Sequence, residues 1–146
     1  MSISAWINTD SVSSGVDVIV CDCNSSANSS QFCLEINRTA GRISALANGN
    51  TVALTGSTTL SINRWYHVVL VRYGTTGNWN YLIYIDGVID GSANTAANPD
   101  SQQGAAIGRF GNSSSGYFNG KISNVAIYNQ VISPEDVKYL YNGGTP

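Results

Sequence analysis

The sequence predicts an all-β protein, in which two antiparallel sheets pack as a sandwich and one short helix lies near the C-terminus. Three observations support this prediction. Most of the chain divides into short segments in which apolar and polar residues alternate, as they do along half-buried strands. Turn residues separate these segments at the short intervals that are typical of a sandwich. Only one segment, at 133–141, carries the start and stop signals of a helix.

Ten segments are predicted as strands from their alternation and their content of β-branched and aromatic residues. They are 2–8, 16–23, 32–37, 42–47, 51–55, 65–73, 81–85, 88–90, 105–108 and 117–128. In the first segment Trp6 faces the side opposite to Ile3, Ala5 and Ile7, because side chains alternate along a strand. Segment 65–73 is the longest β-branched and aromatic run, which indicates a central strand.

Dipeptides that favour tight turns separate several of these strands. Asn48-Gly49 and Asp86-Gly87 are typical of two-residue hairpin turns. Gly120 interrupts a strand pattern, which predicts a bulge or a close approach of another backbone. The segments 24–31, 94–103 and 112–116 are polar and are expected to be surface loops.

The helix is predicted from its first turn. Ser133 can cap the N-terminus, Pro134 suits the first helical position, and two acidic residues follow it. A glycine pair after Asn142 ends the helix. Three apolar residues share one face that we expect to pack on the sandwich: Val137, Leu140 and Tyr141.

Composition limits the classes of function. The 146 residues suffice for one domain, 1–146, and 42% of them are hydrophobic. Only 11% are charged and the net charge is -2, which argues against nucleic acid or a polybasic membrane surface as partner. No apolar run approaches the roughly 20 residues of a membrane span, and no signal peptide is visible after Met1.

Three cysteines lie within thirteen residues, at positions 21, 23 and 33. Cys21 and Cys23 share one face of a strand, and Cys33 begins what we expect to be the returning strand. A cross-strand disulfide from Cys33 to Cys21 or Cys23 is one interpretation, and three half-buried strand residues are the other. Metal binding by three thiols without a fourth ligand is disfavoured.

Few residues could perform acid–base chemistry. His67 is the single histidine, and it shares a strand face with Trp65, Val69 and Val71, which favours a structural role over a catalytic base. Glu35 and Glu135 are far apart in sequence, and no nucleotide-binding loop or nucleophile elbow occurs. Trp65, Val69 and Ile127 are expected in the core.

The second half of the chain resembles a known family. The matching stretches are Trp65-Tyr66-His67-Val68-Val69, Tyr84-Ile85-Asp86-Gly87, Ile107-Gly108 and Phe118-Asn119-Gly120-Lys121-Ile122-Ser123-Asn124-Val125-Ala126-Ile127-Tyr128. With the opening Ser2-Ile3-Ser4-Ala5-Trp6, they are similar to the laminin G-like jelly roll of the concanavalin A-like lectin/glucanase superfamily. The resemblance therefore implies a jelly-roll form of the sandwich over nearly the whole chain.

Two departures from the family bear on metal binding. The opening strand segment usual in the family is absent, and Asn124 stands where many members carry an acid. In the family such groups often hold a structural calcium ion, so both losses argue against that ion here, and we expect no cofactor. The remaining acids Asp86, Asp90 and Asp100 are interpreted as solvated turn residues.

The favoured function is a non-catalytic, lectin-like carbohydrate-binding or recognition module, with a glycan or a glycosylated surface as partner. Sugars bind to aromatic rings and neutral hydrogen-bonding side chains, which this composition supplies. The candidate ligand-binding residues are Asn78, Trp79 and Asn80, together with Arg109, Asn112 and Tyr117. Alternatively, Trp79 packs under its own hairpin. Hydrolysis is not expected, because no strand carries the pair of acids that glycoside hydrolysis needs.

The alternative function is a structural or adhesive surface protein of a phage, a virus or a secreted assembly, and either function places the chain outside the cell or on a virion. Without the opening segment, strand 2–8 would expose a sheet edge that carries no charge and no proline. We therefore expect a homo-oligomer or a larger assembly, unless the C-terminal residues or a missing part of a longer chain cover that edge.

Overall fold

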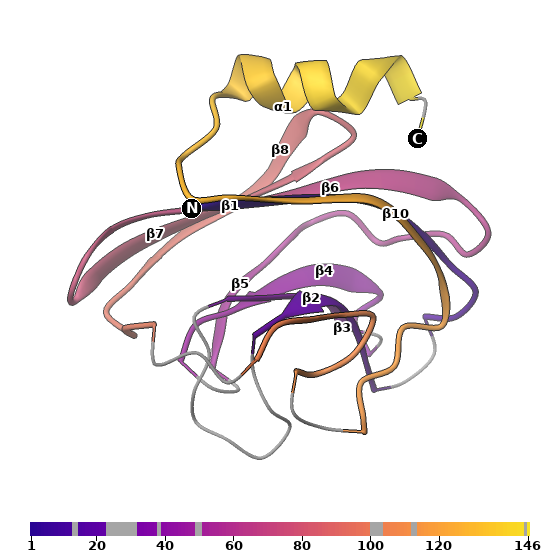
Figure 1. Ribbon diagram of the computed structural model, residues 1–146, viewed down its shortest axis with the longest axis horizontal. Coiled ribbons are helices and arrows are strands. Elements are labelled where there is room, and N and C mark those ends of the chain that lie inside the picture. The colour runs from indigo at the N-terminus through magenta and orange to yellow at the C-terminus, as the bar shows by residue number, and fades with distance from the viewer. Residues whose placement is uncertain are drawn as a thin grey trace.

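Two five-stranded antiparallel sheets, A and B, face each other, and one helix lies on the outer side of sheet A (Figure 1). This computed structural model describes residues 1–12, 15–22, 32–37, 39–48, 51–99, 104–111, 114–144 and 146. In sheet A the strand order is β10 (Gly120–Tyr128), β1 (Ser2–Thr9), β6 (Trp65–Thr75), β7 (Asn78–Ile85) and β8 (Val88–Thr95). In sheet B it is β5 (Val52–Thr55), β4 (Arg42–Leu46), β3 (Cys33–Asn37), β2 (Val16–Cys21) and β9 (Ala106–Ile107). The predicted sandwich is confirmed.

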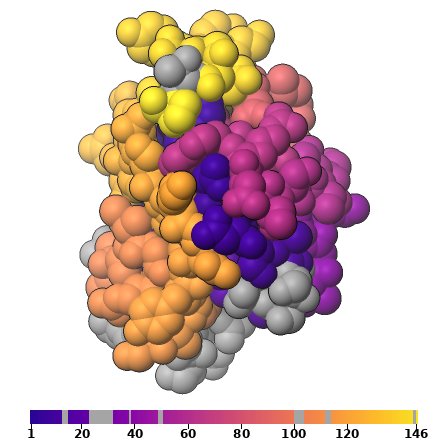
Figure 2. Space-filling view, turned by 90° about the vertical axis from the view of Figure 1, so that its right-hand side faces the viewer, coloured from indigo at the N-terminus to yellow at the C-terminus, as the bar shows by residue number. Residues whose placement is uncertain are grey.

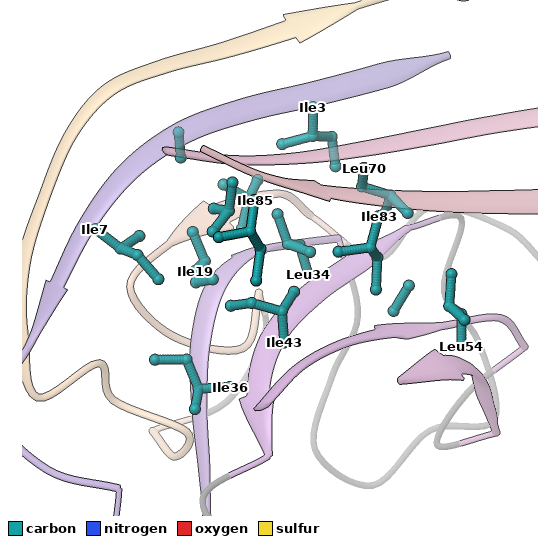
Figure 3. Packing of buried hydrophobic residues seen from close by; sticks show 14 of the residues in the cluster. Ile3, Ile7, Ile19, Leu34, Ile36, Ile43, Leu54, Leu70, Ile83 and Ile85 are labelled. Atoms are coloured by element: carbon teal, nitrogen blue, oxygen red, sulfur yellow. The ribbon is translucent and has the colours of Figure 1, made fainter. Parts of the chain in front are cut away.

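The core fills the space between the two sheets (Figure 3). Ile3, Ala5 and Ile7 of β1 point inward with no exposed surface, as the alternation predicted. They meet branched residues of both sheets, among them Ile43 and Ile83. Burial of such side chains supplies about 25 cal/mol for each Å² removed from water, and this is the main term that holds the sheets together.

Strand β1 lies in the interior of its sheet. It pairs with β6 on one side and with β10 on the other, so the predicted free edge at 2–8 is wrong. Figure 2 shows the same order on the surface, with indigo β1 between magenta β6 and orange β10. The C-terminal part of the chain covers the edge, which removes the reason for expecting self-association through this strand.

The backbone geometry requires glycine at two positions, Gly87 and Gly120. Asp86 and Gly87 have φ values of 51° and 79°, as a type I′ turn requires, so the predicted hairpin between β7 and β8 is confirmed. Gly120 has a φ of 146°, and a Cβ added there would collide with the carbonyl oxygen of Asn8 on β1. The close backbone approach predicted at Gly120 is therefore present.

Helix α1 (Pro134–Tyr141) begins at the predicted cap. The Ser133 hydroxyl accepts from the Asp136 backbone N–H at 3.1 Å, and the Asp136 carboxylate accepts from the Ser133 N–H at 2.9 Å. Val137 is fully buried against Val69 and Val71, so the predicted packing face is confirmed. A 3₁₀ turn, Asn142–Gly144, follows. Among the described residues no helix is long and apolar enough to cross a bilayer.

Two of the predicted core residues are not fully buried. Val69 is buried, but Trp65 is partly exposed and Ile127 is 50% exposed. Ile127 lies on β10, which is an edge strand and pairs only with β1. A side chain at a sheet edge lacks neighbours on one side, and alternation along a strand cannot show which strand forms the edge.

The cysteines differ from the prediction. Cys21 and Cys33 lie directly opposite each other on β2 and β3, yet Cys33 is a free, buried thiol. Cys21 is disulfide-bonded, and because Cys33 is free, Cys33 is not its partner. The predicted disulfide that involves Cys33 is therefore wrong. Cys23 lies outside the described residues.

Candidate carbohydrate-binding surface

The residues predicted to bind a ligand fall in two places. Asn78, Trp79 and Asn80 form the start of β7 in sheet A. Arg109 and Tyr117 lie in the segment that follows β9 of sheet B, and Asn112 lies outside the described residues. The first group stands at the end of the β6–β7 hairpin, which projects at the left of Figure 1 beyond α1.

Trp79 faces the interior side of sheet A. It is partly buried against the main core, and the Arg72 guanidinium lies 5.2 Å from its ring centroid. Its indole N–H donates to Asn98 Oδ1 at 3.1 Å. Because a cation and the core occupy its surroundings, the packed alternative describes Trp79 better than an open sugar platform does.

Asn78 and Asn80 point to the opposite, outer face, because side chains alternate along β7. There a third amide joins them. Asn94 of β8 donates through Nδ2 to Asn78 Oδ1 at 2.6 Å and to Asn80 Oδ1 at 3.1 Å. The polar segment 94–103 predicted a loop at Asn94, whereas β8 continues to Thr95 and pairs with β7 along its length.

An exposed tyrosine completes this surface. Tyr73 lies directly opposite Asn80, which in turn lies directly opposite Asn94, so the three form a row across β6, β7 and β8. The Tyr73 side chain is 43% exposed. The alternation of β6 puts it on this face, but only the register between strands places it beside the amides.

The row borders a shallow groove of about 480 Å³ on the outer face of sheet A. Apolar and uncharged polar side chains line it, chiefly Tyr73, Asn80, Leu82, Ile89, Ser92 and Asn94. No acidic or basic side chain is among the described residues that line it. The groove therefore offers an aromatic ring, apolar surface and amides, which is a neutral hydrogen-bonding site.

The second predicted group is arranged differently. Arg109 donates through Nη1 to the carbonyl oxygens of Phe110 at 2.9 Å and Gly111 at 3.0 Å, so its guanidinium supports its own loop. Tyr117, in the same segment between β9 and β10, has a side chain that is 57% exposed. These residues and the Tyr73 row belong to different layers of the sandwich, and they do not form one site.

His67 is buried, as the structural interpretation predicted. Its Nε2 lies 2.8 Å from the Ser4 hydroxyl, and its ring packs beside Trp6 with centroids 5.2 Å apart. Burial lowers the pKa of His67 from 6.5 to about 4, so the ring is neutral at physiological pH. A buried neutral ring with a serine neighbour fits a structural residue.

The acidic residues also have structural roles. Asp86 accepts from the His67 backbone N–H and pairs with Arg64, both at 3.0 Å. Asp90 accepts from the Thr58 backbone N–H at 3.0 Å. Asp86 does lie in the β7–β8 turn, but the interpretation of these two acids as solvated is wrong, because β6 and the segment at Thr58 donate hydrogen bonds to their carboxylates. Asp100 lies outside the described residues.

Burial changes the protonation of Glu35. It is 4% exposed on β3, and burial raises its pKa from 4.5 to about 7. Within the described part of the chain, no group of three or more His, Cys, Asp or Glu side chains could hold a metal ion.

Solved structures with the same fold include two whose names state a carbohydrate ligand or carbohydrate binding, and a pentraxin. A putative carbohydrate-binding protein from Bacteroides ovatus ATCC 8483 matches with a TM-score of 0.72 and 23% identity, over 94% of this chain and 39% of that one. A heptameric SAP-like pentraxin from Limulus polyphemus matches with a TM-score of 0.72 and 18% identity, over 99% and 71%. The sialidase CBM40 of Ruminococcus gnavus bound to α2,3-sialyllactose matches with a TM-score of 0.72 and 14% identity, over 96% and 81%.

These likenesses show a shared fold, and this chain spans about two fifths of the Bacteroides protein. No curated protein sequence matches the chain. A family profile does match, over residues 1–138, and it describes the concanavalin A-like lectin/glucanases superfamily. The match takes in all ten strands and the start of the helix, and the two-sheet sandwich agrees with it. The chain belongs to the concanavalin A-like lectin/glucanase superfamily.

Proposed function

We propose that this protein is a non-catalytic carbohydrate-binding module whose ligand lies in the groove on the outer face of sheet A. One observation carries the proposal. Tyr73, Asn80 and Asn94 form a cross-strand row beside an uncharged groove. The row brings an exposed aromatic ring and amide groups to one place on a rigid sheet.

The chemistry of this row suits a sugar. A pyranose ring has an apolar face that can lie on an aromatic side chain, and its hydroxyls both donate and accept hydrogen bonds. Tyr73 offers the ring, and the amides of Asn80 and Asn94 offer both hydrogen-bonding functions. Leu82 and Ile89 add apolar surface to the lining of the groove. Solved structures of the same fold that hold arabinotriose or α2,3-sialyllactose support the proposal.

Binding without hydrolysis follows from the placement of the acids. Glycoside hydrolysis needs two carboxyl groups that face each other across the scissile bond. Among the described residues, none of the acids lines the groove. Asp86 and Asp90 serve the packing of loops, and Glu35 lies on β3 of the other sheet. The module would therefore hold a glycan without cleaving it.

A glycan array followed by calorimetric titration tests the proposal. The variant Tyr73→Ala removes the exposed ring and should weaken binding of an array-selected oligosaccharide roughly tenfold. Tyr139→Ala is the matched control, since Tyr139 is 84% exposed on α1 and does not line the groove. Absence of binding to every glycan, or equal loss in both variants, would refute the proposed function.

A further inference from the structure

Two amides of the groove, Asn80 and Asn94, form a fixed array with the neighbouring amide of Asn78. Asn94 uses both hydrogens of its Nδ2 group, one toward Asn78 and one toward Asn80. The orientation of all three amides follows from these two bonds, because each Oδ1 of Asn78 and Asn80 is turned toward Asn94. Their Nδ2 groups are then directed away from it.

The remaining hydrogen-bonding groups of this array are available to a ligand. They are the NH₂ groups of Asn78 and Asn80 and the Oδ1 of Asn94, none of which makes another hydrogen bond among the described residues. Asn78 and Asn94 are exposed, and Asn80 lines the groove beside Tyr73. The surface therefore presents two donor groups and one acceptor in a set arrangement.

From this array we infer that the groove selects neutral glycans over sialylated or uronic acid-containing ones, with Asn94 as the residue that fixes its polarity; the inference rests on the proposed function. A sugar hydroxyl both donates and accepts, so a set of hydroxyls can satisfy two donors and an acceptor together. A carboxylate only accepts, so it leaves the Asn94 Oδ1 without a donor.

Charge acts in the same direction. A carboxylate that enters the groove loses part of its hydration, and this loss is compensated best where a cation replaces the water. The described residues that line the groove include no lysine or arginine. The net charge of the chain is -2, which adds no attraction for an anion.

The test compares matched glycans and two isosteric variants. The full chain is titrated with lactose and with α2,3-sialyllactose, or with whichever neutral and sialylated pair the array selects, and we expect the neutral member to bind at least tenfold more tightly. Asn94→Asp replaces the donor by a carboxylate, so the amides of Asn78 and Asn80 would turn their NH₂ groups inward. We expect it to weaken neutral glycan binding at least tenfold.

Asn129→Asp is the control, because it makes the same change of charge after β10, at the opposite edge of sheet A from β8. It should bind as the unaltered protein does, and thermal unfolding verifies that both variants are folded. Equal affinity for the neutral and sialylated members, or an Asn94→Asp variant with unchanged affinity, would overturn this inference while Tyr73-dependent glycan binding would still support the proposed function. Failure to bind any glycan would overturn both.

Discussion

Tyr141 of the C-terminal helix stacks on Trp6 of β1, with ring centroids 5.8 Å apart and 23° between the ring planes. The two residues are separated by nearly the whole length of the chain. Trp6 faces outward from the core side of β1, and α1 covers it. The C-terminal helix is thus joined to the first strand, and Figure 2 shows it, in yellow, above the end of the sheet.

We expect Tyr141→Ala to lower the free energy of unfolding by about 1–3 kcal/mol, because it removes a stacked aromatic pair and leaves Trp6 uncovered. Urea denaturation measures the change. Tyr139→Ala is the control on the same helix and should change stability by less than about 0.5 kcal/mol, since Tyr139 is 84% exposed. Equal effects of both substitutions would contradict the importance of the stack.

Trp79 gives a second prediction, because it packs inward from the candidate surface. Trp79→Phe keeps an aromatic ring against Arg72 but removes the N–H that donates to Asn98. We expect stability to fall by about 1 kcal/mol, while the affinity for an array-selected glycan changes less than twofold. Calorimetry measures both quantities. A selective loss of glycan affinity at unchanged stability would restore Trp79 as a ligand-binding residue.

The strands and the helix were predictable because their signals are local. The alternation of Ile3, Ala5 and Ile7 with Trp6 shows which face is buried, whichever strands lie beside β1. The cap at Ser133 and the turn at Asp86 depend on a few adjacent residues and were found at their predicted positions. For such features the neighbouring residues in the sequence decide the structure.

The candidate surface depends on register, which the sequence does not specify residue by residue. Tyr73, Asn80 and Asn94 form a row only because three strands pair at one particular offset. The same limit explains Ile127, whose exposure follows from the position of β10 at the edge of the sheet. Asn78 and Asn80 were proposed because they flank Trp79 beside a polar loop, whereas Asn94, whose amide orients them, was assigned to a loop.

The pKa of Glu35 leads to a prediction about pH. Its folded value of about 7 lies above the ordinary 4.5, so the folded protein holds a proton that the unfolded chain has released. The stability that this proton contributes is complete below pH 4.5 and is lost as the pH rises to about 7, by at most about 3 kcal/mol. Glu35→Gln should remove this loss, so the variant should gain stability relative to the unaltered protein between pH 4.5 and 7.

Because His67 also changes stability with pH, the Glu35 effect is measured by comparing the pH profiles of the Glu35→Gln variant and the unaltered protein. Its pKa is lowered to about 4, so its contribution is complete above pH 6.5 and is lost as the pH falls toward 4. The effects of His67 and Glu35 on stability oppose each other between about pH 4.5 and 6.5, so the stability of the unaltered protein is expected to change little there. The difference between the Glu35→Gln and unaltered profiles isolates Glu35. A difference that stays constant from pH 4 to 8 would contradict the raised pKa.

The last prediction concerns the Cys33 thiol. It is fully buried between β2 and β4, beside Leu46 and Phe110, and burial raises its pKa well above the usual 9. Only the thiolate reacts rapidly with iodoacetamide, so Cys33 should remain unmodified in the folded protein at pH 8 and react within minutes in urea. Peptide mapping without reductant identifies the site. The result expected is alkylation at Cys33 but not at Cys21 after unfolding, since Cys21 is already disulfide-bonded. A Cys33-containing disulfide in that map, or rapid alkylation of the native protein, would show that this thiol is either paired or accessible.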